Sequence, residues 1–188
     1  IEGDATAATY FAALATLHRS TIHLDNLNVN TTQGDIEFLS VCEQLGATVL
    51  KHDQGITITG PTQLNSLPEI NMVDMPDAAL TLMAMAPYLP DKIRITGLAT
   101  LRHKECDRIS CPALELRKAG IATEEGPDHI TIVPGETQPA VFDTYDDHRM
   151  AMAFAIFATG APGCSIRDPN CVNKTYANFW TDLARAYH

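Results

Sequence analysis

The stretch that decides the fold is DDHRMAMAFAIF, residues 146–157. Two acidic residues and the pair His148-Arg149 lead directly into eight residues with almost no polar side chain. An Asp at a helix start accepts hydrogen bonds from backbone N–H groups that have no partner within the helix. A helix that is apolar all round has to be buried. The stretch therefore predicts a buried helix whose first turn carries charged side chains.

Two further stretches repeat this pattern, GDATAATYFAALA at residues 3–15 and PDAALTLMAMA at residues 76–86. Their acidic residues Asp4 and Asp77 precede Asp147 in a regular series, with separations of 73 and 70 positions. Each apolar helix is followed by one predicted strand and one more amphipathic helix. The strands are expected at residues 21–24, 92–96 and 164–167, and the second helices at 35–45, 106–119 and 175–186.

The first two copies continue past a glycine into a predicted hairpin. Gly46 and Gly120 suit the left-handed position that ends many helices. The paired strands are expected at residues 47–50 with 56–59, and at 121–123 with 130–133. We therefore predict one α/β domain made of three repeats, at about 1–73, 74–143 and 144–188, with three apolar helices buried at its centre. The starts of these helices would meet at one end, where their positive dipole ends favour anions.

Composition excludes several classes of function. A net charge of −10 disfavours nucleic acid as a partner, because a nucleic-acid binder needs a basic surface. No apolar run reaches the roughly 18 residues of a membrane span, so no membrane partner is expected. The five cysteines form no CxxC pair, which predicts no metal site. Their odd number without a secretory signal predicts reduced thiols in the cytoplasm. The chain begins with Ile1 and has no targeting pattern, so we interpret this end as a cut inside a longer protein.

Basic residues follow two of the predicted strands. Lys104 and Lys174 are 70 positions apart, as Asp77 and Asp147 are, and are therefore equivalent in the repeat. If the helix starts converge, a basic cluster forms that can bind phosphate or carboxylate; its members are Lys104, Arg108, Arg149 and Lys174. A simpler interpretation stays open at this point. Residues 104–108 could be a solvated helix face with a local Glu105–Arg108 pair, Asp77 a plain helix cap and His148 a structural residue.

Several of these segments resemble the 5-enolpyruvylshikimate-3-phosphate synthase family. They are KECDR at 104–108, DDHRMAM at 146–152, EGD at 2–4, QGD at 33–35, PDAA at 76–79 and KT at 174–175. The resemblance implies a domain of three βαβαββ units, an inside-out α/β barrel-like arrangement with buried apolar helices and outer sheets. It also implies that the chain is the carboxyl-terminal domain of such a protein and that the amino-terminal domain is absent. Because that domain usually borrows a strand from the far amino end, an unpaired sheet edge is expected here.

The resemblance also implies a reaction and its residues. The family joins phosphoenolpyruvate to the 5-hydroxyl of shikimate 3-phosphate and releases phosphate, with no metal or organic cofactor. Asp77 and Glu105 are then the catalytic acid/base pair. Shikimate 3-phosphate is expected to contact Asp77, Lys104 and Thr100, although Thr100 and Leu101 depart from the family's usual Asn and aromatic residue. Phosphoenolpyruvate is expected to contact Arg108, Arg149 and Lys174, with His148 nearby.

The amino-terminal domain of this family supplies further contacts to both substrates. We therefore expect this chain alone to be inactive and the amino-terminal domain to be its required partner. Two other functions stay open on the sequence: transfer of enolpyruvate to UDP-N-acetylglucosamine, and a non-catalytic binding domain built on the same repeat. A nucleic-acid-end enzyme of similar architecture is disfavoured by the charge.

Overall fold

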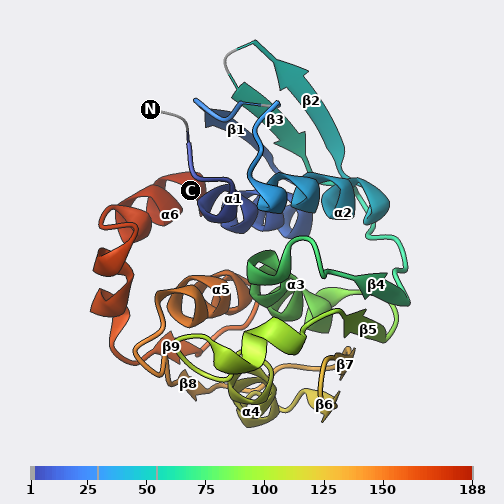
Figure 1. Cartoon of the computed structure of the whole chain (residues 1–188), viewed down its shortest axis with the longest axis vertical. Helices are drawn as coiled ribbons and strands as arrows, with labels where there is room; N and C mark the ends of the chain where they lie inside the picture. Colours follow the sequence, from blue (N-terminus) through green and yellow to red (C-terminus); the bar gives the residue numbers. More distant parts are fainter. Residues whose placement is uncertain (1–2, 29, 54, 188) are drawn as a thin grey trace.

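The computed structural model describes residues 3–28, 30–53 and 55–187. Three helices, α1 (Ala5–His18), α3 (Ala79–Met85) and α5 (His148–Thr159), lie in the middle of the molecule (Figure 1). All seven residues of α3 are buried. The Thr9 and Thr81 hydroxyl groups form a hydrogen bond of 2.8 Å between α1 and α3. The prediction of three buried apolar helices is therefore confirmed.

The three central helices begin at the same end of the molecule. Asp77 at the start of the α3 segment lies 3.2 Å from Arg149 in the first turn of α5. At the opposite end, the His18 ring of α1 lies 2.7 Å from the Thr159 hydroxyl of α5. The charged residues at the starts of α3 and α5 are therefore brought together.

The strands form sheets outside these helices. The first sheet has the order β1-β3-β2 and is antiparallel; the second has the order β4-β5-β7-β6, with β4 and β5 parallel; β8 and β9 form a parallel pair. The strands are β1 (Thr21–Asp25), β2 (Thr48–His52), β3 (Gly55–Thr59), β4 (Glu69–Asn71), β5 (Ile93–Thr96), β6 (Ala122–Glu125), β7 (Ile130–Val133), β8 (Val141–Phe142) and β9 (Ser165–Ile166). Both predicted hairpins are present. Among the described residues, β1 lies at a sheet edge.

Other helices connect and cover these elements. They are the α-helices α2 (Phe38–Gln44), α4 (Ser110–Lys118) and α6 (Phe179–Tyr187), and the 3-10 helices η1 (Gly34–Glu37), η2 (Pro76–Ala78), η3 (Ala86–Tyr88), η4 (Ala99–His103) and η5 (Pro169–Lys174). Gly46 and Gly120 have φ values of +103° and +83°, as expected of left-handed helix ends. No helix in the described part of the chain is long and apolar enough to cross a membrane.

The sequence placed the start of α4 too early. We expected this helix from residue 106, but it begins at Ser110. Just before it, the Asp107 carboxylate accepts the N–H groups of Ile109 and Ser110, both at 3.0 Å. Lys104 stays extended, with φ −102° and ψ −156°. The helix expected from residue 175 likewise begins only at Phe179, after η5. Residues 104–108 therefore form a connecting segment and not a helical turn.

Candidate anion-binding site

The three acidic residues near the starts of the central helices differ in whether they cap a helix. Asp4 accepts the Thr6 N–H at 2.9 Å, and Asp147 accepts the Arg149 N–H at 2.9 Å, so both cap a helix. Asp77 lies inside η2 and makes no capping hydrogen bond. The simpler interpretation of Asp77 as a plain helix cap is therefore wrong. Its carboxylate is left available to neighbouring cations.

Three cations surround the Asp77 carboxylate. Lys104 Nζ lies 3.4 Å and Arg108 Nη1 3.0 Å from its Oδ1, and Arg149 Nη2 lies 3.2 Å from its Oδ2. The fourth predicted cation, Lys174, has its Nζ 4.0 Å from Glu105 Oε1. The predicted basic cluster and the two predicted catalytic carboxylates therefore lie together, although they come from segments far apart in the sequence.

Arg108 is the buried centre of this site, with a side chain only 1% exposed. Its Nε donates to Asp147 Oδ2 at 2.7 Å and its Nη2 to Asp147 Oδ1 at 3.0 Å, a forked two-point contact. Its Nη2 also donates to Glu105 Oε2 at 2.7 Å. The local Glu105–Arg108 pair is therefore present, but the solvated helix face is not, because the guanidinium is enclosed by carboxylates.

Electrostatics keep this buried pair charged. Burial raises the pKa of Asp147, but the hydrogen bonds and charge of Arg108 outweigh burial, so the pKa lies below its ordinary value of 3.8. Burial lowers the pKa of Arg108, and the Asp147 carboxylate more than restores it. A buried ion pair of this kind holds two segments in a fixed relation, here the segment before α4 and the start of α5.

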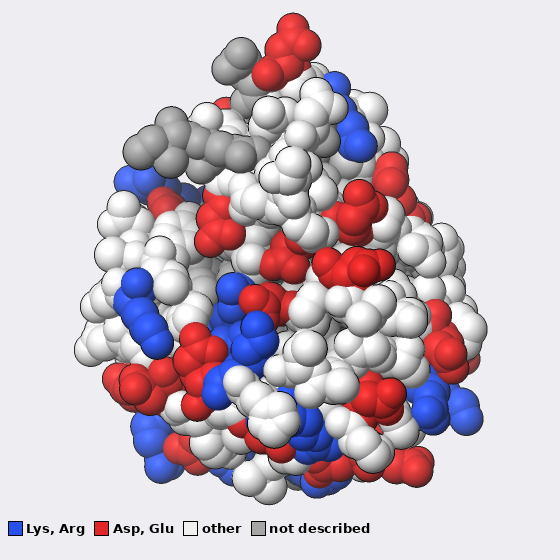
Figure 2. Space-filling model, in the orientation of Figure 1, with Lys and Arg blue, Asp and Glu red and all other residues white. Residues whose placement is uncertain are grey.

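Solvent reaches the site from the side of the other three cations. The side chains of Lys174, Lys104 and Arg149 are 61%, 33% and 18% exposed. Figure 2 shows Lys and Arg side chains gathered near the middle of this face, directly beside Asp and Glu side chains. A dissolved phosphate or carboxylate therefore meets these cations first, and Arg108 lies behind them.

Two predicted residues lie apart from the ring of cations around Asp77. His148 is 5% exposed, and its Nδ1 lies 3.9 Å from Asp147 Oδ1 with no hydrogen-bond partner in the described structure. Burial lowers its pKa, which favours the neutral ring. Thr100 is exposed on η4.

The sequence did not assign three other residues to the site. Asp147 was interpreted only as a cap, although its place in the DDHR motif was a usable signal. Tyr10 of α1 is buried close to Arg149; burial raises the pKa of its hydroxyl and the Arg149 charge partly opposes this. Asp35 accepts a hydrogen bond from Thr6, and burial raises its pKa, with Arg149 and Asp77 among its charged neighbours. Neither Tyr10 nor Asp35 has a spacing in the sequence that predicts this.

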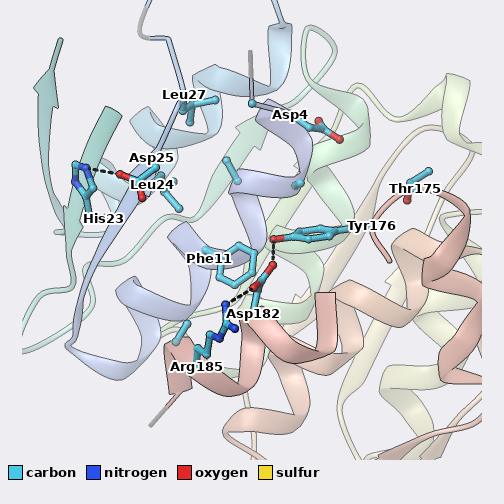
Figure 3. A pocket seen from close by; sticks show the side chains of 14 residues that line it. Asp4, Phe11, His23, Leu24, Asp25, Leu27, Thr175, Tyr176, Asp182 and Arg185 are labelled. Atoms are coloured by element: carbon cyan, nitrogen blue, oxygen red, sulfur yellow. Dashed lines mark hydrogen bonds and ion pairs between the residues drawn. The ribbon is translucent and has the colours of Figure 1, made fainter. Parts of the chain in front are cut away.

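A separate groove of about 700 Å³ lies between α1, β1 and α6 (Figure 3). Arg185 is the one Lys or Arg among its described lining residues, and it pairs with Asp182 at 3.5 Å. The Tyr176 hydroxyl also donates a hydrogen bond to the Asp182 carboxylate, at 2.9 Å. With its one cation already paired, this groove suits an anion less well than the cluster around Asp77. No group of three or more His, Cys, Asp or Glu in the described residues could hold a metal ion.

The fold is similar to that of solved structures. The chain superimposes on the EPSP synthase of Acinetobacter baumannii with a TM-score of 0.80 at 22% identity, covering 99% of this chain and 46% of that one. The enolpyruvyl transferase NikO of Streptomyces tendae gives a TM-score of 0.75 at 17% identity, covering 99% and 43%. These likenesses establish the architecture at the level of an α/β fold.

The sequence gives the family. The family model of EPSP synthase (3-phosphoshikimate 1-carboxyvinyltransferase) matches residues 1–183, and the chain belongs to this family. It is 41% identical over 181 residues to the 3-phosphoshikimate 1-carboxyvinyltransferase of Nostoc punctiforme, which covers 96% of this chain and 42% of that protein. It is 39% identical over 194 residues to the chloroplastic enzyme of Petunia hybrida, covering 100% and 37%. The chain therefore spans less than half the length of these relatives.

Proposed function

We propose that the natural protein containing this chain transfers the enolpyruvyl group of phosphoenolpyruvate to the 5-hydroxyl of shikimate 3-phosphate and releases phosphate. The observation that carries the proposal is the convergence of Lys104, Arg108 and Arg149 on the Asp77 carboxylate. Both substrates carry a phosphate and a carboxylate, and clustered cations bind such groups. The family match favours this acceptor over UDP-N-acetylglucosamine.

Asp77 and Glu105 are the proposed acid/base pair. Asp77 accepts the proton of the 5-hydroxyl while that oxygen attacks the vinyl carbon, and Glu105 donates a proton to the methylene carbon. The methyl group of the tetrahedral adduct then returns a proton to the Glu105 carboxylate as phosphate leaves, which regenerates the vinyl bond of the enolpyruvyl group. In the present structure both carboxylates are engaged by cations. An incoming anion competes for these cations and so frees the carboxylates for proton transfer.

The cations divide between the two substrates in this proposal. Lys104, and Thr100 with its hydroxyl, contact shikimate 3-phosphate. Arg149 and Lys174 hold phosphoenolpyruvate from the open side. Arg108 is also assigned to phosphoenolpyruvate, but its N–H groups already face three carboxylates, so it reaches a ligand only by exchanging Asp77 or Glu105. His148 lies near the phosphate of phosphoenolpyruvate and is not essential for the reaction.

The finer architecture is part of the same proposal. We propose three βαβαββ units, at about 1–73, 74–143 and 144–188, arranged inside out with helices within and sheets outside. The observed order β4-α3-β5-α4-β6-β7 supports the unit because it contains all six elements, although β4 (Glu69–Asn71) lies just before residue 74. The first stretch also contains α1-β1-α2-β2-β3, and the third contains α5-β9-α6, with β8 (Val141–Phe142) just before residue 144. The proposed partner is the amino-terminal domain of the natural protein. The five free cysteines support a cytoplasmic location.

Phosphate release by the whole natural protein from the two substrates tests the function. We expect Asp77→Asn to lower kcat by about 10²- to 10⁴-fold, the usual contribution of a positioned acid or base. Asp182→Asn in the groove of Figure 3 is the control and should leave kcat within twofold, about 0.4 kcal/mol. Turnover with UDP-N-acetylglucosamine in place of shikimate 3-phosphate would show that the acceptor is wrong. A Glu105→Gln protein of unchanged biological activity would show a non-catalytic role.

A further inference from the structure

The turn that leads into α5 has an unfavourable backbone for its sequence. The Asp147 N–H donates to the Thr144 carbonyl at 2.9 Å, so residues 144–147 form a hydrogen-bonded four-residue turn. Its two central residues, Tyr145 and Asp146, both have φ of 55°. Two positive φ values in succession are typical of a type I′ turn, which Gly, Asn and Asp dominate. Tyrosine at the first central position is therefore strained, and something outside the turn has to hold it.

A fully buried carboxylate on α4 holds this turn. Glu115 has no exposed surface, and its Oε1 accepts hydrogen bonds from the Tyr145 hydroxyl and, at 2.8 Å, from Lys118 Nζ. Its Oε2 accepts the Asp143 N–H at 3.0 Å. Lys118 also pairs with the Asp143 carboxylate at 2.7 Å. Glu115, Lys118 and Tyr145, which we name the turn clamp, thus fix the residues on both sides of Thr144.

The turn is tied to one segment of chain at two points. Arg108, two residues before α4, binds the Asp147 carboxylate, and Glu115 within α4 binds Tyr145. Arg149 follows Asp147 by two residues, and its N–H is capped by that carboxylate. A shift of the turn therefore moves both the partner of Arg108 and the backbone that carries Arg149.

We propose that Glu115 and Tyr145 are positioning residues, which hold the strained turn so that Arg149 stays opposite Asp77. Neither residue touches the ring of cations, and both act through Asp147. The kinetic part of this inference rests on the proposed function. The structural part rests only on the contacts of the turn.

The first experiment measures KM for each substrate with the whole natural protein. Glu115→Gln replaces one acceptor oxygen of the clamp with an NH₂ group, and Tyr145→Phe removes only the hydroxyl. We expect KM for phosphoenolpyruvate to rise at least fivefold in Glu115→Gln and at least twofold in Tyr145→Phe, with KM for shikimate 3-phosphate within twofold. If Glu115→Gln does not fold, the two KM values of Tyr145→Phe alone test the proposal. Equal changes in both KM values, or none, would overturn the proposal.

Glu125→Gln is the matched control. Glu125 also binds the α4 region, accepting the Ser110 hydroxyl at 2.6 Å, but it does not contact the turn. Both KM values should stay within twofold of wild type. A rise in KM for phosphoenolpyruvate equal to that of Glu115→Gln would assign the effect to α4 in general and refute a specific clamp.

A rescue experiment separates positioning from plain structural support. Glycine adopts positive φ without strain, so replacing the strained tyrosine by Tyr145→Gly lowers the need for a clamp. In the Glu115→Gln background it should return KM for phosphoenolpyruvate to within twofold of wild type. A double variant no better than Glu115→Gln would show that the strained turn is not what Glu115 serves.

Amide hydrogen exchange tests the clamp without any enzyme assay. In Glu115→Gln, or in Tyr145→Phe if the former does not fold, the Asp147 and Arg149 amides should exchange at least tenfold faster, while those of α3 keep their rates. Unchanged exchange at residues 147 and 149 would refute the clamp even in an active enzyme. Absence of transfer activity in the wild type would instead refute the proposed function and leave this readout valid.

Discussion

Asp147 does two things at once: it caps α5 and neutralises the buried Arg108. Its side chain has no exposed surface, and the guanidinium beside it is 1% exposed. Burying either charge alone would be costly, and the forked contact between them offsets that cost. The pair therefore makes the geometry of the site depend on one carboxylate.

Asp147→Asn should consequently destabilise the protein strongly. An amide offers one acceptor where the carboxylate offered two, and it leaves the Arg108 charge buried without its nearest counter-charge. We expect a loss of about 3–5 kcal/mol in the free energy of unfolding, measured by urea denaturation. Asp182→Asn breaks a largely exposed pair with Arg185 and should cost no more than about 1 kcal/mol. Equal losses in the two variants would contradict the buried role of Asp147.

The same residue gives the protein a pH dependence of known sign. Because Arg108 holds the pKa of Asp147 below 3.8 in the folded state, the unfolded chain binds the proton more readily. The stabilisation is therefore fully present above that value and is lost as the pH falls through the lower, folded-state pKa. Unfolding free energies measured between pH 6 and pH 3 should fall less steeply for Asp147→Asn than for wild type.

At the scale of elements, the central helices pack closely because they are rich in alanine. Ala84 of α3 has no exposed surface, and α3 is buried along its whole length. Ala84→Leu adds three carbon atoms to a filled space and should cost about 1–3 kcal/mol in unfolding free energy. The same substitution at the exposed Ala122 on β6 is the control, with an expected change within about 0.5 kcal/mol. A thermal or urea unfolding series compares them, and equal effects would show that α3 is not tightly packed.

The sequence predicted these helices because their apolar character is local and continuous. It also predicted both hairpins, since the glycine and turn residues stand beside them in the chain. It placed α4 four residues too early and did not predict that the Asp107 side chain, ahead of the helix, accepts the N–H groups of Ile109 and Ser110. The pattern of apolar residues does not show which polar side chain will accept the backbone N–H groups ahead of a helix.

For the site, the sequence predicted the residues but not the contacts between them. From the repeat pattern, Lys104, Lys174 and Arg149 were expected at one end of the molecule, where the structure has them. The pattern did not predict that Asp77 binds cations without capping a helix, or that Arg108 is buried. These facts depend on side-chain directions across segments about 30 to 40 residues apart, Arg108 with Asp77 at 31 and with Asp147 at 39. The contact between Tyr145 and Glu115 was not predicted for the same reason.

At the scale of the whole molecule, the charge of the site is too small for its proposed task. Four cations, Lys104, Arg108, Arg149 and Lys174, form ion pairs with three carboxylates, Asp77, Glu105 and Asp147, and Asp35 is a fourth acidic neighbour. At most one positive charge is left over, whereas the two proposed substrates each carry a phosphate and a carboxylate. The overall charge of −10 opposes their approach as well. Further cations have to come from the remaining part of the natural protein.

This chain alone should therefore release no phosphate from phosphoenolpyruvate and shikimate 3-phosphate, because its cations are engaged by its own carboxylates. Mixing it with a separately expressed amino-terminal part of the natural protein should restore turnover, as the added cations and the closing of two domains would complete the site and exclude water. The measurement is phosphate release with each part alone and with both together. The same mixture made with Asp77→Asn chain controls for activity carried by the added part. Turnover by this chain alone would contradict the charge argument, since one uncompensated cation would then suffice for two phosphorylated substrates.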